Sequence, residues 1–224
     1  MRSVLHKNEL GFGIYTVPDI SRILGFKQAK VRRYLGEYWD KRMGRELFRD
    51  TYSWSSDGRV RAVNFFVLIE LYTFFRLQEH GVKTEIILKA RQHISKQMNV
   101  PYPFASAGLL TDGKKIWYEF QDAIINADGT SQTNFIQIIK NFVEKVDFGD
   151  NKLAEHFFPD GRKSSVIVDP HHQFGQPVIN GTNVNAEILF SMYQSGESLQ
   201  SIGILYDITE KEVKDAIHFY NHAA

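Results

Sequence analysis

Apolar positions near the start of the chain recur at helical spacing in two short runs separated by a glycine. The first run follows Val17-Pro18, where the first turn of a helix tolerates proline, and ends at Gly25. The second run begins near Lys27. The apolar positions are Ile20, Ile23 and Leu24 in the first run, and Val31, Leu35 and Tyr38 in the second. The pattern predicts two short helices joined by a tight break.

The polar positions of the second predicted helix are mostly basic. They are Lys27, Gln28, Lys30, Arg32 and Arg33. A helix with such an exposed face suits a groove lined by phosphates, whereas the alternative is an ordinary solvated surface helix. The short partner helix and the glycine break favour a DNA-binding helix-turn-helix.

A hairpin and two helices are predicted next. Residues 46–61 place β-favouring residues around the turn signal at 55–58, which predicts a hairpin, or wing, that carries Arg59 and Arg61. Residues 63–80 form a strongly apolar helix ended by Gly81. Thr84 is expected to cap a further helix that ends near Met98.

The pattern of apolar and polar residues changes after residue 100. A hairpin about residues 111–114 and an amphipathic helix over 135–146 are predicted, followed by a linker at 160–165. The last sixty residues predict a strand at 165–168 and three short helices. These helices cover 185–194, 198–206 from the cap Ser198, and a segment that opens at the capping box Thr209–Glu212.

These elements define the expected fold class, which is α+β and mostly helical. Residues 1–98 form a winged helix-turn-helix with its following helices, and residues 99–163 form a small mixed α/β layer. Residues 164–224 form a three-helix cluster with short strands. The two helices of 63–98, or the middle region, are expected to form a homodimer contact, because such DNA-binding proteins commonly read two half-sites.

Charge divides the chain, although the net charge is only +1. Residues 1–62 hold 13 basic and 7 acidic side chains, whereas residues 164–224 hold 2 basic and 7 acidic ones. The basic N-terminal region therefore suits a polyanionic partner, and the acidic C-terminal region suits a protein partner. The absence of cysteine excludes disulfides and thiolate zinc sites, and no apolar run is long enough for a signal peptide or a membrane span. We expect a cytoplasmic protein that is not bound to a membrane.

The sequence gives little support for a metal site, a phosphate-binding loop or a catalytic centre. His171, His172, His218 and His222 suggest a metal, but a third ligand has no defined place, so no metal or other cofactor is expected. The loop FGQPVINGT lacks the Lys-Ser/Thr of a phosphate-binding loop, and its glycines fit turns with positive φ. No nucleophile-elbow signature is present, so no catalytic residue is assigned. An enzyme that uses the middle region is the alternative function of a different class.

The residues also carry family resemblances. YTVPDISRILGFKQAKVRRYL resembles the MerR-type winged helix, and YPFASAGLLTDGKKIWYEF resembles the segment that accompanies it in VapB-type antitoxins. The C-terminal stretch, with Gly175 to Thr182 and the ending from Tyr206, resembles the domain-of-unknown-function family 433. The resemblance implies an antitoxin that binds operator DNA as an autorepressor and neutralises a PIN-like ribonuclease toxin.

The resemblance and the charges together define candidate residues. Lys27, Gln28 and Lys30 are expected at base edges, and Arg32, Arg33, Arg59 and Arg61 at phosphates. Acidic residues of the C-terminal domain are expected to face the basic toxin: Asp169, Glu187, Glu197, Asp207, Glu210 and Asp215. The alternative function is a MerR-like one-component transcription regulator, whose aromatic-rich middle senses a small ligand without a toxin partner.

Overall fold

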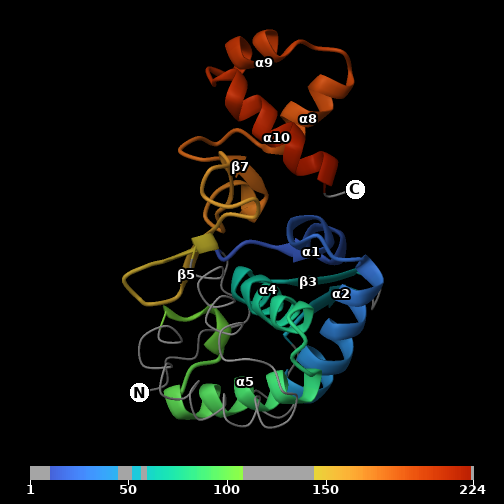
Figure 1. The fold of residues 1–224 in the computed structure, drawn as a ribbon, viewed down its shortest axis with the longest axis vertical. Helices are drawn as coiled ribbons and strands as arrows, with labels where there is room; N and C mark the ends of the chain where they lie inside the picture. Colours follow the sequence, from blue (N-terminus) through green and yellow to red (C-terminus); the bar gives the residue numbers. More distant parts are fainter. Residues whose placement is uncertain (1–10, 45–51, 57–59, 108–143, 223–224) are drawn as a thin grey trace. The chain divides into compact units, whose positions relative to one another are not determined.

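The computed structural model describes residues 11–44, 52–56, 60–107 and 144–222 (Figure 1). These residues form a mixed α/β structure that separates into two compact units. The first unit consists of the described residues between Phe66 and Glu155. The second unit joins the described residues up to Phe65 to those from His156 onward. The sequence suggested continuous domains, whereas the second unit is made of two separate stretches of the chain.

The N-terminal part of the second unit contains helices followed by a hairpin. Its elements are β1 (Tyr15–Thr16), α1 (Val17–Leu24), α2 (Gln28–Tyr34), the π-helical segment η1 (Leu35–Gly44), β2 (Trp54–Ser56) and β3 (Val60–Val63). The three strands form an antiparallel sheet in the order β1-β3-β2. The two predicted helices and the strands of the predicted hairpin are confirmed; the hairpin's tip, with Arg59, lies outside the described residues.

Local sequence fixes both ends of α1. Thr16 and Asp19 form a capping box, in which the Thr16 N–H donates to the Asp19 carboxylate at 2.9 Å. Gly25 ends the helix with a φ of 72°, the left-handed conformation that glycine adopts without steric cost. The chain therefore turns sharply into α2, as the glycine break predicts.

The second helix is longer than the sequence indicated. It was expected to end near Tyr38, but α2 continues directly into η1 and reaches Gly44. Buried side chains recur every four residues along it: Val31, Leu35, Trp39 and Met43. The inward stripe thus passes through Trp39 rather than the predicted Tyr38, which is half-buried, and it extends one turn further to Met43.

The first unit holds two helices, a short 3-10 turn and a strand. These are α4 (Phe65–Glu79), whose first residue belongs to the second unit, α5 (Thr84–Met98), η2 (Pro103–Ala105) and β4 (Val146–Phe148). Nearly every side chain of α4 from Phe65 to Phe75 is buried, which confirms the predicted apolar helix. Within the described residues, no helix is long and apolar enough to span a bilayer.

Two expectations for the first unit need correction. Thr84 does not cap α5, because it is the first helical residue, and its hydroxyl instead accepts a hydrogen bond from Gln78 at 2.8 Å. Val146 does not end a helix but begins β4. The hairpin about 111–114 and most of the helix predicted over 135–146 lie outside the described residues.

A buried ion pair crosses between α4 and the residues around α5. Both side chains, Glu70 and Arg91, are fully buried. Glu70 accepts hydrogen bonds from Arg91 Nε at 2.5 Å and from the Phe104 N–H at 3.0 Å. Arg91 also donates to the Pro101 carbonyl at 2.9 Å. The pair therefore holds the segment after α5 against the apolar helix α4.

The C-terminal part of the second unit contains short strands followed by three helices. Its elements are β5 (Ala154–Phe157), whose first two residues belong to the first unit, β6 (Val166–Val168), β7 (Pro177–Ile179), α8 (Ala186–Gln194), α9 (Leu199–Tyr206) and α10 (Glu210–His222). β6 pairs antiparallel with both β5 and β7. The linker predicted at 160–165 lies between β5 and β6, two paired strands of one sheet.

The predicted caps of α9 and α10 are confirmed, and Asn185, predicted as the first residue of its helix, is the N-cap of α8. Asn185 and Ser198 accept hydrogen bonds from backbone N–H groups of the first turns of α8 and α9. The Thr209 N–H donates to the Glu212 carboxylate at 2.7 Å, and Thr209 Oγ1 accepts from the Glu212 N–H. Gly175 and Gly181 both have positive φ, as expected, and Gly175 also admits the Tyr15 ring against its Cα.

The Glu70–Arg91 pair yields a stability prediction. Replacing Glu70 with alanine should lower the free energy of unfolding by about 3–5 kcal/mol, because it leaves a buried guanidinium without its carboxylate. Urea unfolding of the full chain measures the change. The matched control is Glu79→Ala, which removes an exposed 2.7 Å pair with Arg76 and should cost less than about 1 kcal/mol. Equal losses in the two variants would contradict the prediction.

Candidate functional site

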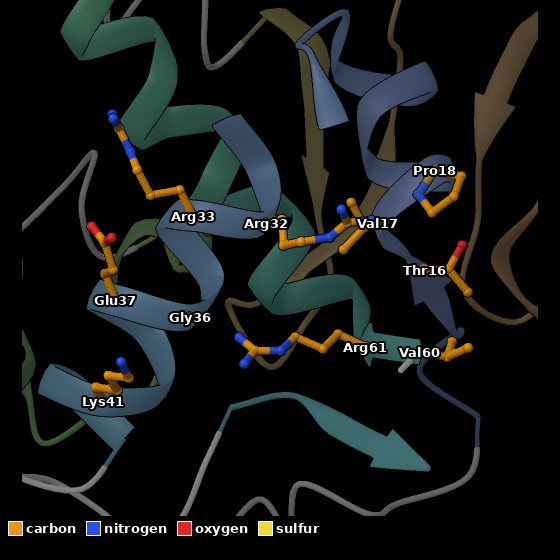
Figure 2. A pocket seen from close by; sticks show the side chains of 10 residues that line it. All are labelled: Thr16, Val17, Pro18, Arg32, Arg33, Gly36, Glu37, Lys41, Val60 and Arg61. Carbon is orange, nitrogen blue, oxygen red and sulfur yellow. The ribbon is translucent and has the colours of Figure 1, made fainter. Parts of the chain in front are cut away.

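A groove of about 620 Å³ opens between the start of α1, the α2–η1 helix and β3 (Figure 2). Arg32 extends from the helix toward the start of α1, and Arg61 extends from β3 toward the helix (Figure 2). The lining residues are Thr16, Val17, Pro18, Arg32, Arg33, Gly36, Glu37, Lys41, Val60 and Arg61. Four cationic side chains and one carboxylate thus line the groove, which makes it strongly electropositive.

The groove gathers part of the predicted basic set. Arg32, Arg33 and Arg61 line it, whereas Lys27 and Gln28 are exposed where α2 begins. Lys30 is half-buried, with its Nζ 4.4 Å from the centre of the Phe26 ring. Within the part of the chain that the structure describes, no acidic side chain pairs with Lys27 or Arg32. These cations are therefore available to a polyanion.

Arg61 differs from the other cations because it is held by a buried carboxylate. Asp40, on η1, accepts hydrogen bonds from the Ser53 N–H at 2.9 Å and the Ser53 hydroxyl at 2.6 Å, and pairs with Arg61 at 3.3 Å. The Arg61 guanidinium passes over Gly36, where an added Cβ would lie 2.7 Å from Nη1. One third of the Arg61 side chain stays exposed, so it positions the hairpin and still faces the groove.

Sequence reasoning missed Glu37, Lys41 and Asp40. Arg33, Glu37 and Lys41 are four residues apart, which places them along one side of a continuous helix. That signal was hidden because the helix was expected to end near Tyr38. Asp40 offered no signal, since a carboxylate at a buried position cannot be told from a surface one by spacing alone.

Of the acidic candidates at the C-terminal end, Asp169 does not lie on the surface. Its side chain is almost fully buried and accepts hydrogen bonds from the His171 N–H at 2.8 Å and from His172 Nδ1 at 2.6 Å. His156 Nε2 lies 3.3 Å from the same carboxylate. Asp169 therefore organises the loop after β6, and its buried carboxylate contributes little charge to the surface.

Asp215 is also engaged within the fold. Its carboxylate accepts hydrogen bonds from the Ser165 N–H at 2.8 Å and from Lys211 Nζ at 2.6 Å, which ties α10 to the start of β6. Burial acts to raise the pKa of Asp215, but hydrogen bonds from Lys211 and Ser165 outweigh it and hold the pKa below the ordinary 3.8. Asp215 is therefore chiefly a structural carboxylate.

The other four acidic candidates are exposed. Glu197 and Asp207 flank α9, and Glu210 begins α10, where it lies 3.7 Å from Lys214. Glu187, on α8, lies 3.4 Å from Arg22 of α1. The Arg22 guanidinium also sits 5.2 Å from the centre of the Tyr220 ring. Burial, followed by the nearby Glu187 charge, raises the pKa of Tyr220 to about 12, so the phenol stays neutral.

The candidate histidines that the structure describes lie in different surroundings. His171 contacts the Phe12 ring at a centroid distance of 6.1 Å, His172 binds Asp169, and His218 is exposed on α10. Among the described residues, no group of three or more His, Asp or Glu side chains could hold a metal ion.

Comparisons with known proteins concern both the C-terminal part and the whole chain. Residues 166–220 match the family model described as "Protein of unknown function (DUF433)". The chain is similar to "Putative antitoxin VapB45" of Mycobacterium tuberculosis, with 24% identity over 166 residues, which cover 68% of this chain and 69% of that protein. The fold is similar to the crystal structure of Rv2018 from Mycobacterium tuberculosis. The two structures match with a TM-score of 0.71 and 20% sequence identity, and the match covers 91% of this chain and 96% of that one.

The lowered pKa of Asp215 gives a prediction of pH dependence. The charged carboxylate stabilises the folded chain above the unfolded pKa of about 4, and this contribution is lost as the pH falls through the lower folded value. Asp215→Asn should therefore be less stable than the parent at pH 7, with the difference shrinking below about pH 4. Urea unfolding at a series of pH values measures this. A difference that stays constant down to the lowest pH would contradict it.

Proposed function

We propose that this protein is the antitoxin of a type II toxin-antitoxin pair that represses its own operator and neutralises a PIN-like ribonuclease. The observation that carries the proposal is the pairing of the electropositive groove with an acidic three-helix cluster in one compact unit. The similarity to a protein described as a putative antitoxin supports the same function.

The front of the chain is proposed to bind double-stranded DNA as a MerR-like winged helix-turn-helix. The arrangement that supports this is α1, the break at Gly25, α2, and the β2–β3 hairpin beside them. Lys27, Gln28 and Lys30 are assigned to base edges, and the arginines at 32, 33, 59 and 61 are assigned to phosphates. A homodimer would present two such surfaces to two half-sites.

The rear of the chain is proposed to bind the toxin. PIN-like nucleases bind RNA with a basic surface, so exposed carboxylates on the antitoxin would attract that surface. The exposed members of the predicted set carry this role: Glu187, Glu197, Asp207 and Glu210. Asp169 and Asp215 instead maintain the fold that presents them.

DNA binding is tested with duplexes taken from upstream of the chain's own gene and with a scrambled duplex. Arg32→Ala should weaken binding to both and flatten the slope of log K against log salt by about 0.9, because one phosphate contact is lost. Gln28→Ala should instead alter the preference between the duplexes, because its amide can pair with adenine. Fluorescence anisotropy at two or more salt concentrations measures these effects.

The matched control for the DNA experiment is Lys89→Ala, which removes an exposed cation from α5. It should leave both the affinity and the salt slope unchanged. Parent-like binding by Arg32→Ala and Gln28→Ala at every salt concentration would rule out this DNA surface. Operator affinity that changes only when a small metabolite is added would favour the one-component sensor instead.

Toxin binding is tested by co-expression with the product of the adjacent reading frame, followed by co-purification. Charge reversal of Glu197 and Asp207 to lysine in the full chain should weaken the complex at low salt by about tenfold or more, because attraction becomes repulsion. The control reverses Glu155, an exposed carboxylate on β5, and should retain the partner. Equal recovery of the partner by both variants would contradict the role of the acidic surface.

A further inference from the structure

The outward face of α9 carries large aliphatic side chains that the fold does not cover. Ile204 is 76% exposed and Leu205 is 65% exposed, whereas Ile202 on the same helix is fully buried. Gln200 and Ser201, one turn earlier, are also exposed. Because residues four apart share one side of a helix, these four form a continuous outward strip, which we call the α9 patch.

Carboxylates bound the α9 patch along the chain, and α9 itself carries no charged residue. Glu197 precedes its N-cap Ser198, Asp207 is its C-cap, and Glu210 begins the next helix. All three carboxylate residues are exposed. The surface therefore has an apolar centre and an acidic border, the arrangement typical of a protein-binding surface with a polar rim.

The inward side of α9 is packed within the fold. Gly203 is buried against the turn into α10, where an added Cβ would lie 2.8 Å from the Ile208 carbonyl oxygen. The Ile208 N–H donates to the Gly203 carbonyl at 3.0 Å. The buried side of α9 thus carries Ile202 and Gly203, and the opposite side, with Ile204 and Leu205, faces outward.

We infer that the α9 patch is the docking surface for the basic toxin, with Ile204 and Leu205 inserted into an apolar depression and the carboxylates facing its Lys and Arg side chains. This inference rests on the proposed function and adds the apolar contacts that the acidic candidates lack. Nucleic acid and anionic lipid do not fit, because the bordering carboxylates repel phosphates.

A second copy of the chain fits the patch less well. A two-fold axis relates two packed α9 helices in an antiparallel or a parallel pair: the antiparallel pair brings Glu197 of one copy to Asp207 of the other, and the parallel pair brings each carboxylate to its own counterpart. Like charges facing each other in this way destabilise the contact. The acidic border therefore selects a partner of opposite charge over self-association.

The experiment uses the full chain and the co-expressed product of the adjacent reading frame, purified and titrated by isothermal calorimetry. The test variant is Ile204→Ser with Leu205→Ser, which removes both aliphatic side chains and leaves every charge in place. We expect binding at least about tenfold weaker than the parent, with the same steepness of salt dependence. Operator DNA binding of the variant should equal that of the parent, which shows that the chain is folded.

The matched control is Ile14→Ser, which removes an exposed aliphatic side chain (46%) just before β1, outside the groove, and should bind the partner as the parent does. If the parent binds and the double variant binds equally well, the α9 patch is not the docking surface, although the proposed function stands. If the parent itself does not bind, both the proposed function and this inference are overturned. A double variant that changes the chain from dimer to monomer in light scattering would also overturn the inference, since the patch would then be a self-interface.

Discussion

The electropositive groove depends on one buried carboxylate, that of Asp40. This side chain receives two hydrogen bonds from Ser53, just before the hairpin, and the guanidinium of Arg61 from its return strand. The hairpin is thereby fixed to the α2–η1 helix at two points. A buried charge requires partners, so the burial of Asp40 depends on its ion pair with Arg61, and this pair holds Arg61 at the groove. The same interaction that stabilises the hairpin thus shapes the wall of the groove.

Carboxylates of one chemical type serve opposite purposes in this chain, and burial decides which. Asp40, Glu70 and Asp169 are buried, and each accepts several hydrogen bonds that hold loops or helices together. Glu197 and Asp207 are exposed beside α9, and neither side chain holds loops or helices together in the described structure. The number of acidic residues in a domain therefore overstates its surface charge, because some of the carboxylates are buried and paired within the fold.

The sequence predicted the elements whose ends are set by local interactions. The start of α1 at Val17-Pro18, its end at Gly25 and the caps at Ser198 and Thr209 were predicted correctly, because each depends on residues within one turn. It failed where distant residues decide. The extension to Gly44, the pairing of β5 with β6 across the supposed linker, and the burial of Asp169 all depend on contacts that no local pattern records. For the site, the basic residues were visible in the sequence, but the partners that position them were not.

The opposite charges of the two ends of the chain are not consumed by each other, although both ends belong to one compact unit. The Arg22–Glu187 contact joins them, but it is long at 3.4 Å, and nearly half of the Glu187 side chain is exposed. Such exposed pairs contribute little to stability, about 1 kcal/mol or less. The cations of the groove and the carboxylates beside α9 are not neutralised by this contact. Because charge alone gives steering more than affinity, a tight and specific complex at the acidic end requires apolar burial as well, and α9 presents the aliphatic side chains that can supply it.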